Sequence, residues 1–500
     1  MLLTCVCCVL LLNSCKVTKI KDEIKSELNL LSAIPQNSSF VFEIKGKSLI
    51  EKGVLNTPER YKFWNKVKEK LTENPEIYKL VNSFLTEEYP LGLDINKLYL
   101  FSEELNKYGV ALAKIQDKNK LETELKTLKI PEIKDNGHFK SVISDEFSLL
   151  WNNEVLFFVL GNLENPEKLV DYSPLNGMSL NPVFVKFTAK QSDLGFWMSY
   201  DKVCEIANIN IAEKDSIKDT YLYINTNFAQ GELELTTSVQ NKSGKLLWEE
   251  YNITKPSFNK DLLYIYPEKS FFSVVLSVNP EGYLNFLKNH AWLTPKFSMK
   301  PEDSDEFKNI AEIIKHFEGD VVLNVYGFSQ GMLPLPLAGL NFTVAGERSF
   351  KELLSLIPNK EINQNGDYYY MNISSMILYF AYKNKVVMLT NDNEMIKNFI
   401  AGTKLPKNLS HSYITQKLDG VSSSVYLNLS IDEYPENIQL AITKTANSLL
   451  KNNINLFKDI SINSANNNRD NVISLKFKDK TKNSLARILE LTDNYFSIAN

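Results

Sequence analysis

An internal duplication is the feature that most limits what this chain can fold into. IPQNSSFVFEIKGKSL at 34–49 is matched by YPEKSFFSVVLSVNPEGYL at 266–284, and WNNEVLFFVLGN at 151–162 is matched by YKNKVVMLTND at 382–392. Further pairs of stretches keep the same offset of roughly 230 residues, and a constant offset indicates a repeated structural unit. The sequence therefore predicts two similar halves, at 34–260 and 261–500.

A smaller unit recurs within each half. Four stretches, which begin at Val110, Leu233, Leu340 and Ile473, share an apolar strand of period two, a polar turn and an amphipathic helix. The turns hold Asp, Asn, Ser or Thr, which cap helix N-termini. Another strand followed by a helical segment precedes each stretch. The order β-α-β-β-α predicts an α+β fold, in which each half has antiparallel sheets with helices packed on one face.

The N-terminus has the pattern of a lipoprotein leader. The apolar run in MLLTCVCCVLLLNSCK is too short to span a bilayer. It ends in Leu12-Asn13-Ser14-Cys15, which resembles the relaxed lipobox of Bacteroidetes lipoproteins. We therefore predict a signal peptide at 1–14, a lipidated Cys15, and a tether at 15–33. No Lys or Arg precedes the apolar run, so the usual basic start of a signal peptide is missing.

The motif GFSQG at 327–331 raises the question of a serine hydrolase. A nucleophile elbow needs a helix directly after the serine, but Pro334 and Pro336 exclude a regular helix there. The first half has a short connector between two strands at the same place, so Ser329 is predicted to lie at a hairpin tip. A formal triad of Ser329, Asp392 and His411 has the right chain order, and nothing else recommends it.

Other chemistry is not indicated, and we predict no catalytic residue, no metal site and no cofactor. The four histidines do not have metal-ligand spacing, and no glycine-rich phosphate loop occurs. In HFEG, His316 is predicted to close a helix that Gly319 ends. The formal net charge of −4 comes from interspersed charges, and the absence of a basic patch argues against nucleic-acid binding.

The lipobox and the opening IPQNSSFVFEIKGKSLIEKG resemble a family of large Bacteroidetes lipoproteins of unknown function. The residues that carry the likeness are Pro35, Phe40, Val41, Ile44, Ser48, Leu49 and Lys52. The resemblance implies an outer-membrane lipoprotein that faces the periplasm or the cell surface, and it transfers no catalytic residue.

Three functions are compatible with the sequence. The first is a non-enzymatic binding or scaffolding module that is anchored in the membrane through Cys15 and has another envelope protein or a glycan as its partner. The second is a cell-envelope hydrolase with a site between the halves. The third is a periplasmic chaperone or carrier for apolar ligands, which predicts a large exposed apolar surface.

Overall fold

The computed structural model describes most of the chain from residue 30 to residue 498. The residues within this range that it does not describe are 74, 105–106, 128–131, 145–146, 162, 171–176, 207–218, 242–251, 256, 290–304, 331–333, 358–361, 375, 413–420, 446–453 and 466–469. The chain forms two compact units. Unit 1 contains residues up to 203 with 217–227 and 240–244, and unit 2 contains 204–216, 228–239 and 245–500.

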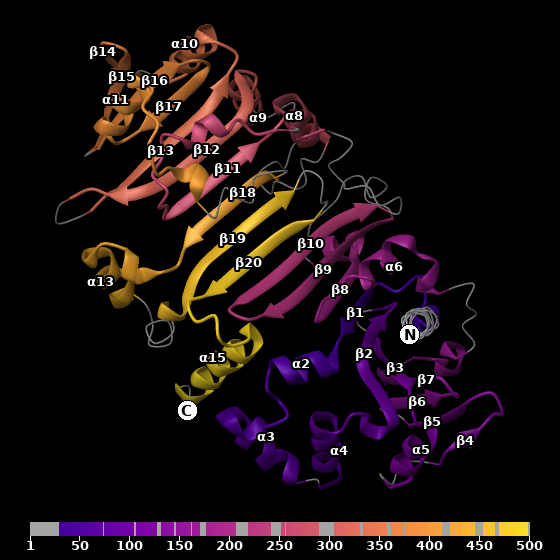
Figure 1. Cartoon of the computed structure of the whole chain (residues 1–500). Coiled ribbons are helices and arrows are strands. Elements are labelled where there is room, and N and C mark those ends of the chain that lie inside the picture. The colour runs from indigo at the N-terminus through magenta and orange to yellow at the C-terminus, as the bar shows by residue number, and fades with distance from the viewer. Residues whose placement is uncertain are drawn as a thin grey trace, which may run out of the picture. The chain divides into compact units, whose positions relative to one another are not determined.

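Unit 1 is built on an antiparallel sheet with the strand order β4-β5-β6-β7-β3-β2-β1-β8-β9 (Figure 1). The strands are β1 (Phe40–Ile44), β2 (Leu93–Ser102), β3 (Tyr108–Ile115), β4 (Lys134–Asp135), β5 (Lys140–Ile143), β6 (Phe147–Trp151), β7 (Val155–Gly161), β8 (Leu194–Ser199) and β9 (Thr220–Ala229). The helices are α2 (Gly46–Lys52), α3 (Lys62–Thr72), α4 (Pro75–Thr86), α5 (Lys118–Thr127), α6 (Pro182–Thr188) and α7 (Tyr200–Ile206), whose last residues belong to unit 2.

Buried clusters lie on both faces of this sheet, because strand neighbours such as Leu112 and Ala113 belong to different clusters, and α5 packs on the second of them. Val41 on β1 lies between Phe101 on β2 and Trp197 on β8, and all three side chains are buried. Helix α6 packs over them, with Phe184 edge-on to Trp197 at 5.6 Å between ring centroids. Two residues define the N-terminus of α6. The Asn181 side chain caps it, and Pro182 occupies the first helical position.

The strands of unit 2 are also antiparallel, in the order β10-β20-β19-β18-β11-β12-β13-β17-β16-β15-β14. The strands are β10 (Glu232–Asn241), β11 (Phe272–Ser277), β12 (Phe317–Phe328), β13 (Pro336–Val344), β14 (Asn363–Asn365), β15 (Tyr368–Ile373), β16 (Met376–Lys383), β17 (Val386–Thr390), β18 (Val421–Asn428), β19 (Phe457–Ala465) and β20 (Asn471–Phe477). The helices are α8 (Pro280–Asn289), α9 (Asp305–Ile314), α10 (Glu347–Ser355), α11 (Asn393–Ala401), α13 (Glu436–Thr445) and α15 (Ser484–Ile498).

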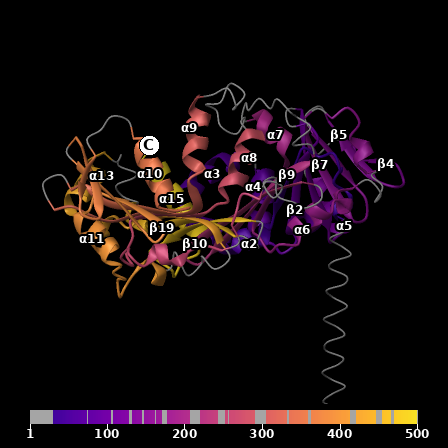
Figure 2. The ribbon, with the colours of Figure 1, turned by 90° about the horizontal axis from the view of Figure 1, so that it is seen from above.

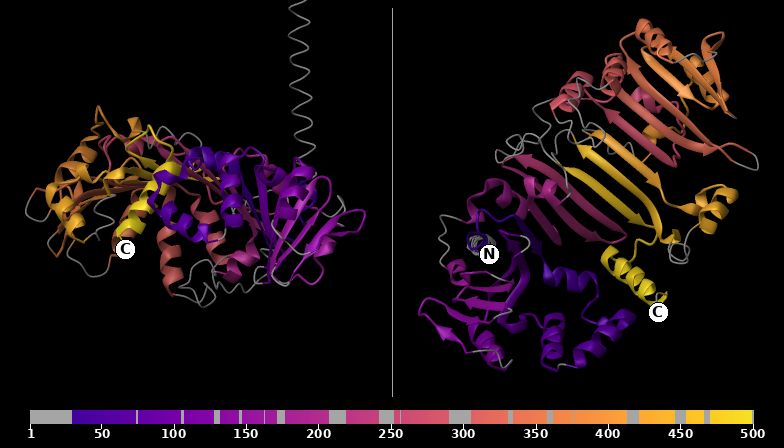
Figure 3. Two further views of the ribbon diagram at one scale, coloured as in Figure 1. Left: turned by 90° about the horizontal axis from the view of Figure 1, so that it is seen from below. Right: turned by 180° about the vertical axis from the view of Figure 1, so that it is seen from behind.

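The helices of unit 2 lie on both faces of its sheet. Met395 and Ile396 of α11 join a core cluster with Val322 on β12, whereas Phe350 of α10 joins a separate cluster with Phe342 on β13. Phe342 pairs with Val321, the neighbour of Val322, so the two clusters are on opposite faces. Figure 2 and the left view of Figure 3 show α8 and α9 on the side opposite α11. The mixed fold with a large antiparallel sheet is confirmed, but the prediction of helices on one face is wrong for both units, since α5 and α6 of unit 1 also belong to clusters on opposite faces.

Gly319 has a different role from the predicted one. Helix α9 ends at Ile314, and Gly319 lies within strand β12, at a register shift in the pairing with β13. Its φ of +103° is a conformation that side chains other than glycine rarely adopt. HFEG therefore starts a bulged strand, and the sequence interpretation of Gly319 as a helix end is corrected.

Candidate ligand-binding face

Ser329 lies in the connection between β12 and β13, as the sequence predicted. Phe328 pairs with Pro336 across the hairpin, and the Ser329 backbone N–H donates to the Leu335 carbonyl at 2.8 Å. The Ser329 hydroxyl accepts a hydrogen bond from the Leu335 N–H at 2.9 Å. The next described element after the serine is strand β13, so GFSQG is not followed there by the helix of a nucleophile elbow.

The other two members of the formal triad have local structural roles. The Asp392 carboxylate caps helix α11 by accepting from the N–H groups of Glu394 and Met395, and its second oxygen accepts from the Tyr326 hydroxyl at 2.9 Å. His411 ends the short 3-10 helix Leu409–His411, where its side chain accepts from the Asn408 N–H. Asp392 therefore caps a helix and His411 stabilises a short turn, and both roles are structural.

The remaining predicted site residues give no further centre. Cys15 lies outside the described residues. Within the part of the chain that the structure describes, no group of three or more His, Cys, Asp or Glu side chains could hold a metal ion. No described helix is long and apolar enough to cross a membrane. Cys204 is buried on α7.

Ser48 and Lys52, which the sequence singled out, hold a buried carboxylate. On helix α2 they are four residues apart and therefore on one face. The Ser48 hydroxyl donates to Asp193 at 2.6 Å, and the Lys52 ammonium lies 2.7 Å from both oxygens of Asp193. Asp193 precedes β8, and its carbonyl accepts from the Lys45 N–H after β1. The cluster thus fastens α2 to the start of β8.

Unit 2 contains a cluster of the same three residue types. Lys255 lies 2.7 Å from one oxygen of Asp320, and the Ser277 hydroxyl donates to the other at 3.0 Å. Asp320 is buried on β12, next to the last residue of β11. In both units the lysine neutralises the carboxylate, and the serine donates a hydrogen bond to it. Each cluster is therefore a structural clasp rather than a reactive group.

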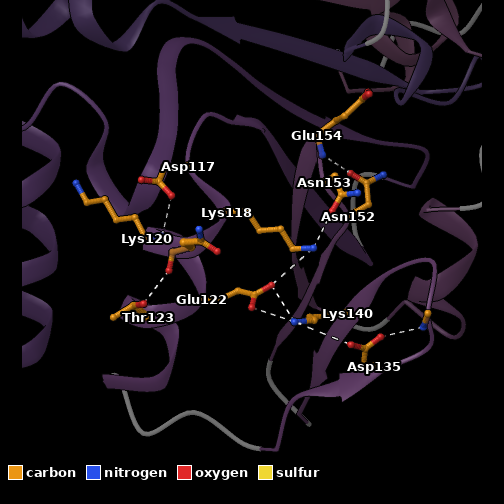
Figure 4. A network of polar contacts seen from close by, with 12 residues as sticks. Asp117, Lys118, Lys120, Glu122, Thr123, Asp135, Lys140, Asn152, Asn153 and Glu154 are labelled. Carbon is orange, nitrogen blue, oxygen red and sulfur yellow. Dashed lines mark hydrogen bonds and ion pairs between the residues drawn. The ribbon is translucent and has the colours of Figure 1, made fainter.

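A network of polar side chains on unit 1 joins helix α5 to the neighbouring strands (Figure 4). Lys140 on β5 lies 2.9 Å from both oxygens of Glu122, and Lys118 donates to Asn153 at 2.7 Å. Burial acts to raise the pKa of Glu122, but the hydrogen bond and charge of Lys140 outweigh it and lower that pKa. The charged side chains in this network pair with one another. The network therefore holds helix α5 on the strands rather than forming a binding site.

The sheet of unit 2 has an unusual distribution of polarity. Its inner face, covered by α11 and the 3-10 helix Lys260–Leu263, carries a run of buried polar side chains, namely Thr390, Asn341, Asn324, Ser273, Ser424, Asn463, Ser461 and Ser474. Ser424 donates to Asn463 at 2.7 Å, and Ser270 donates to Asn324 at 2.5 Å. The Ser273 hydroxyl and the Asn324 Nδ2 have no hydrogen-bond partner among the described residues. Polar groups thus occupy positions where a sheet normally places its apolar residues.

The opposite face of the same strands is apolar, and we call it the apolar face. Two rows of side chains cross seven strands from β13 to β10. The first row is Ala338, Val325, Phe272, Leu427, Ile460, Leu475 and Leu233, and the second is Leu340, Leu323, Val274, Val425, Ile462, Ile473 and Leu235. None of the fourteen is fully buried, and Leu427 and Ile462 are 38% and 39% exposed. The other twelve are partly buried, so the exposed part of this face, around Leu427 and Ile462, is the candidate site of interaction.

The alternation of polar and apolar residues along each strand could have predicted this face. FSVVLS, SVYLNLS and ISLKF alternate small polar and large apolar residues, which predicts a strand with two unlike faces. Such a pattern ordinarily places the apolar set against the core. In unit 2 the helix α11 covers the polar set, whereas helices α8, α9 and α10 lie on the side of the apolar set (Figure 2).

A buried tyrosine provides a test of the packing of unit 1. Burial, followed by the charge of Glu103 and a hydrogen bond to it, raises the pKa of Tyr108 to about 12, from about 10 in an unfolded chain. The stabilisation from the neutral hydroxyl is complete below pH 10 and is lost as the pH rises from about 10 to 12, because only the unfolded chain releases the proton there. In chemical denaturation at pH 8 to 12, the Tyr108→Phe variant should therefore lose less stability than the parent. Equal losses would contradict this assignment.

Comparison with known proteins gives a family. A family model described as a domain of unknown function, DUF4836, matches residues 31–485. The chain belongs to this family. No curated protein matches the chain.

Among solved structures, crystal forms of TP0453 are similar to parts of this chain. Form IV has 11% sequence identity and a TM-score of 0.28, and the match covers 42% of this chain and 79% of TP0453. Form III has 11% identity and a TM-score of 0.28, and the match covers 43% and 81%. Scores this low carry no argument about this member of the DUF4836 family.

Proposed function

We propose that this DUF4836 protein is a non-enzymatic binding module of the cell envelope and that its ligands are apolar. The apolar face of unit 2 is the observation that carries the proposal. Half-exposed aliphatic side chains cost free energy in water, at about 25 cal/mol per Å² of apolar surface. Leu427 and Ile462 are exposed while polar groups are buried on the other face of the same strands, so a ligand that covers them would gain free energy.

The predicted duplication is part of the same proposal. Strands β7-β3-β2-β1-β8-β9 of unit 1 and β17-β13-β12-β11-β18-β19 of unit 2 pair in the same sequence. An isolated bridge joins Pro35 to Gly177 in unit 1, and a second joins Pro267 to Asn408 in unit 2. These parallels support two copies of one ancestral β-α-β-β-α arrangement, at 34–260 and 261–500, of which the second specialised its sheet face for binding.

Location in the envelope is proposed from the leader. An acylated Cys15 would hold the chain on a membrane, since several acyl chains anchor far more firmly than one. The tether, predicted at 15–33, would separate the anchor from the folded units and would end before Leu30, because Leu30 and Leu31 already lie in the core of unit 1. The protein is then an outer-membrane lipoprotein that faces the periplasm or the cell surface, where its partner is an apolar ligand or an apolar part of another envelope component.

Dye binding tests the proposed function. The full chain with Cys15→Ser, which cannot carry its own lipid, should enhance the fluorescence of the apolar dye N-phenyl-1-naphthylamine. The double variant Leu427→Glu/Ile462→Glu should lower the dye affinity at least tenfold, because two carboxylates in the centre of the apolar face oppose an apolar ligand.

The control for this experiment is Ile377→Glu. Ile377 lies on β16 of the same unit and is 40% exposed, but it belongs to neither row of the apolar face. This variant should bind the dye as the parent does. Unchanged binding by the double variant, with its circular dichroism intact, would refute the proposed function.

A further inference from the structure

We propose that the end of the unit 2 sheet at β14, β15 and β16 binds a neutral oligosaccharide on its α11 side. This site is separate from Leu427 and Ile462, and its ligand belongs to a different chemical class from that of the proposed function. Three observations carry the proposal. They are half-exposed tyrosines where unit 1 has a buried pair, amide side chains beside these tyrosines, and a neighbouring cation that is already paired.

The strand pairing places three tyrosines on one surface, which we call the tyrosine face. Tyr368, Tyr370 and Asn372 alternate along β15 and therefore point to the same side of the sheet. Tyr370 is cross-strand from Tyr379 on β16, and Asn365 on β14 is cross-strand from Tyr368. The rings of Tyr368 and Tyr379 contact each other edge-on, at 5.9 Å between centroids. Both also pack against the core cluster that α11 joins, so these five residues form a face on the α11 side.

The tyrosine face is partly open because α11 packs mainly on β16 and β17. One cross-strand row runs from Thr390 on β17 through Tyr379 and Tyr370 to Asn363 on β14. Its side chains change from buried on β17, through half-buried on β16 and β15, to exposed on β14. The two amide residues of the tyrosine face are exposed as well. A ligand can therefore reach the rings from the end of the sheet.

The same place in unit 1 is fully buried. Strands β5 and β6 have the positions in the strand order of unit 1 that β15 and β16 have in unit 2. Ser141 and Tyr370 each lie four residues after the glycine of an Asn-Gly turn. Ser141 is cross-strand from Leu150, and both are 0% exposed. Unit 2 thus has large, partly exposed aromatic residues at a place that unit 1 uses for packing, which indicates a binding role.

The residue types of the tyrosine face suit a sugar. The face of a tyrosine ring can stack on the C–H groups of a pyranose, and its hydroxyl can hydrogen-bond to the sugar hydroxyls. The Asn365 amide donates to the Tyr368 hydroxyl at 2.8 Å, so the O–H of Tyr368 can itself donate to a ligand. Amide side chains have both donors and an acceptor, as sugar hydroxyls require. Burial raises the pKa of Tyr379, so its hydroxyl stays neutral at physiological pH.

Charge and strand length argue against other classes of ligand. Lys397 on α11 lies beside Tyr368 and Tyr379, but it is paired with Glu394 at 3.0 Å. The cation next to the tyrosine face is therefore already neutralised, which disfavours a phosphate or an acidic glycan. The edge strand β14 is only three residues long, so an added peptide strand would find few backbone groups to pair with. A neutral saccharide uses both the ring faces and the amides.

Calorimetry with defined oligosaccharides tests the proposal. The full chain with Cys15→Ser is titrated with three neutral probes, cellohexaose, chitohexaose and maltohexaose, and with one acidic probe, hexagalacturonate. We expect at least one neutral hexasaccharide to bind, at one site per chain and more tightly than hexagalacturonate. Tyr370→Ala should weaken this binding about tenfold or more, because it removes the stacking surface. Tyr370→Phe keeps the ring and should weaken it less.

The matched control is Tyr283→Ala. Tyr283 is a 37% exposed tyrosine on α8 of the same unit, outside the tyrosine face. This variant and Leu427→Glu/Ile462→Glu should bind the hexasaccharide as the parent does. Equal weakening by Tyr370→Ala and Tyr283→Ala, or tighter binding of hexagalacturonate, would contradict the proposal.

The remaining outcomes separate this site from the proposed function. If none of the three neutral hexasaccharides binds, the proposal is wrong, even where N-phenyl-1-naphthylamine binds. Hexasaccharide binding that Tyr370→Ala weakens, without any binding of the dye, would support the site while the proposed function fails. Concentration-dependent dimerisation that Tyr370→Ala abolishes, in the absence of sugar binding, would assign the tyrosine face to a second copy of the chain.

Discussion

Gly319→Ala is expected to lower the free energy of unfolding of unit 2 by more than about 3 kcal/mol, since strain and overlap of this kind give the largest effects of single substitutions. A Cβ atom at this position would lie 1.7 Å from the carbonyl oxygen of Val278, which is backbone and cannot turn aside. The φ of +103° is also unfavourable for alanine. Strand β12 would have to move away from the end of β11, where the Val278 N–H donates to the Gly319 carbonyl at 2.8 Å.

Chemical denaturation with hydrogen exchange measures this effect and locates it. The protein has two units, so a single transition cannot be assumed, and exchange of the β11 and β12 amides reports on unit 2 directly. Gly366→Ala is the matched control, because Gly366 also has a positive φ, of +60°, and nothing lies within 4 Å of a Cβ added there. It should cost only about 1 kcal/mol. Similar losses in the two variants would mean that the contact with Val278 is unimportant.

Asp193→Ala is expected to destabilise unit 1 by about 2–4 kcal/mol, because removal of one partner from a buried ion pair leaves the other uncompensated. The Asp193 side chain is only 4% exposed and accepts from both Ser48 and Lys52. Lys52 is 33% exposed, so part of its charge can return to water, which keeps the loss below that of a fully buried pair. Hydrogen exchange of the β1 and β8 amides should increase in this variant.

A double variant separates the ion pair from the packing. Lys52→Met/Asp193→Leu replaces both charges with apolar groups, and such replacements are often neutral or stabilising, so it should be more stable than Asp193→Ala alone. Asp305→Ala is the exposed control. Asp305 pairs with Lys308 on the surface of α9, with its side chain 95% exposed, and its loss should cost less than about 1 kcal/mol. If the Lys52–Asp193 pair contributes little to stability, Asp193→Ala and Asp305→Ala should instead lower the free energy of unfolding equally.

Local features of the fold could be predicted because neighbouring residues determine them. The prolines after GFSQG exclude a helix, so Ser329 had to lie in a hairpin connection, and the structure places it there. Asp392 lies just after β17, where its side chain caps α11, and Gly402 ends that helix at φ +74°. Gly319 was misread, because the choice between a helix end and a bulged strand depends on the pairing of β12 with β13, a partner distant in the sequence.

The sequence by itself determined the period-two strands of a mixed fold and the hairpin connection at Ser329. Only the tertiary structure decided which helices pack on each face of the unit 2 sheet. The physical reason is that period-two alternation separates two faces equally well whichever one becomes the core. Side chains such as Leu427 and Ser424 acquire their burial from the helices that pack over each face, and those helices come from segments far away in the chain.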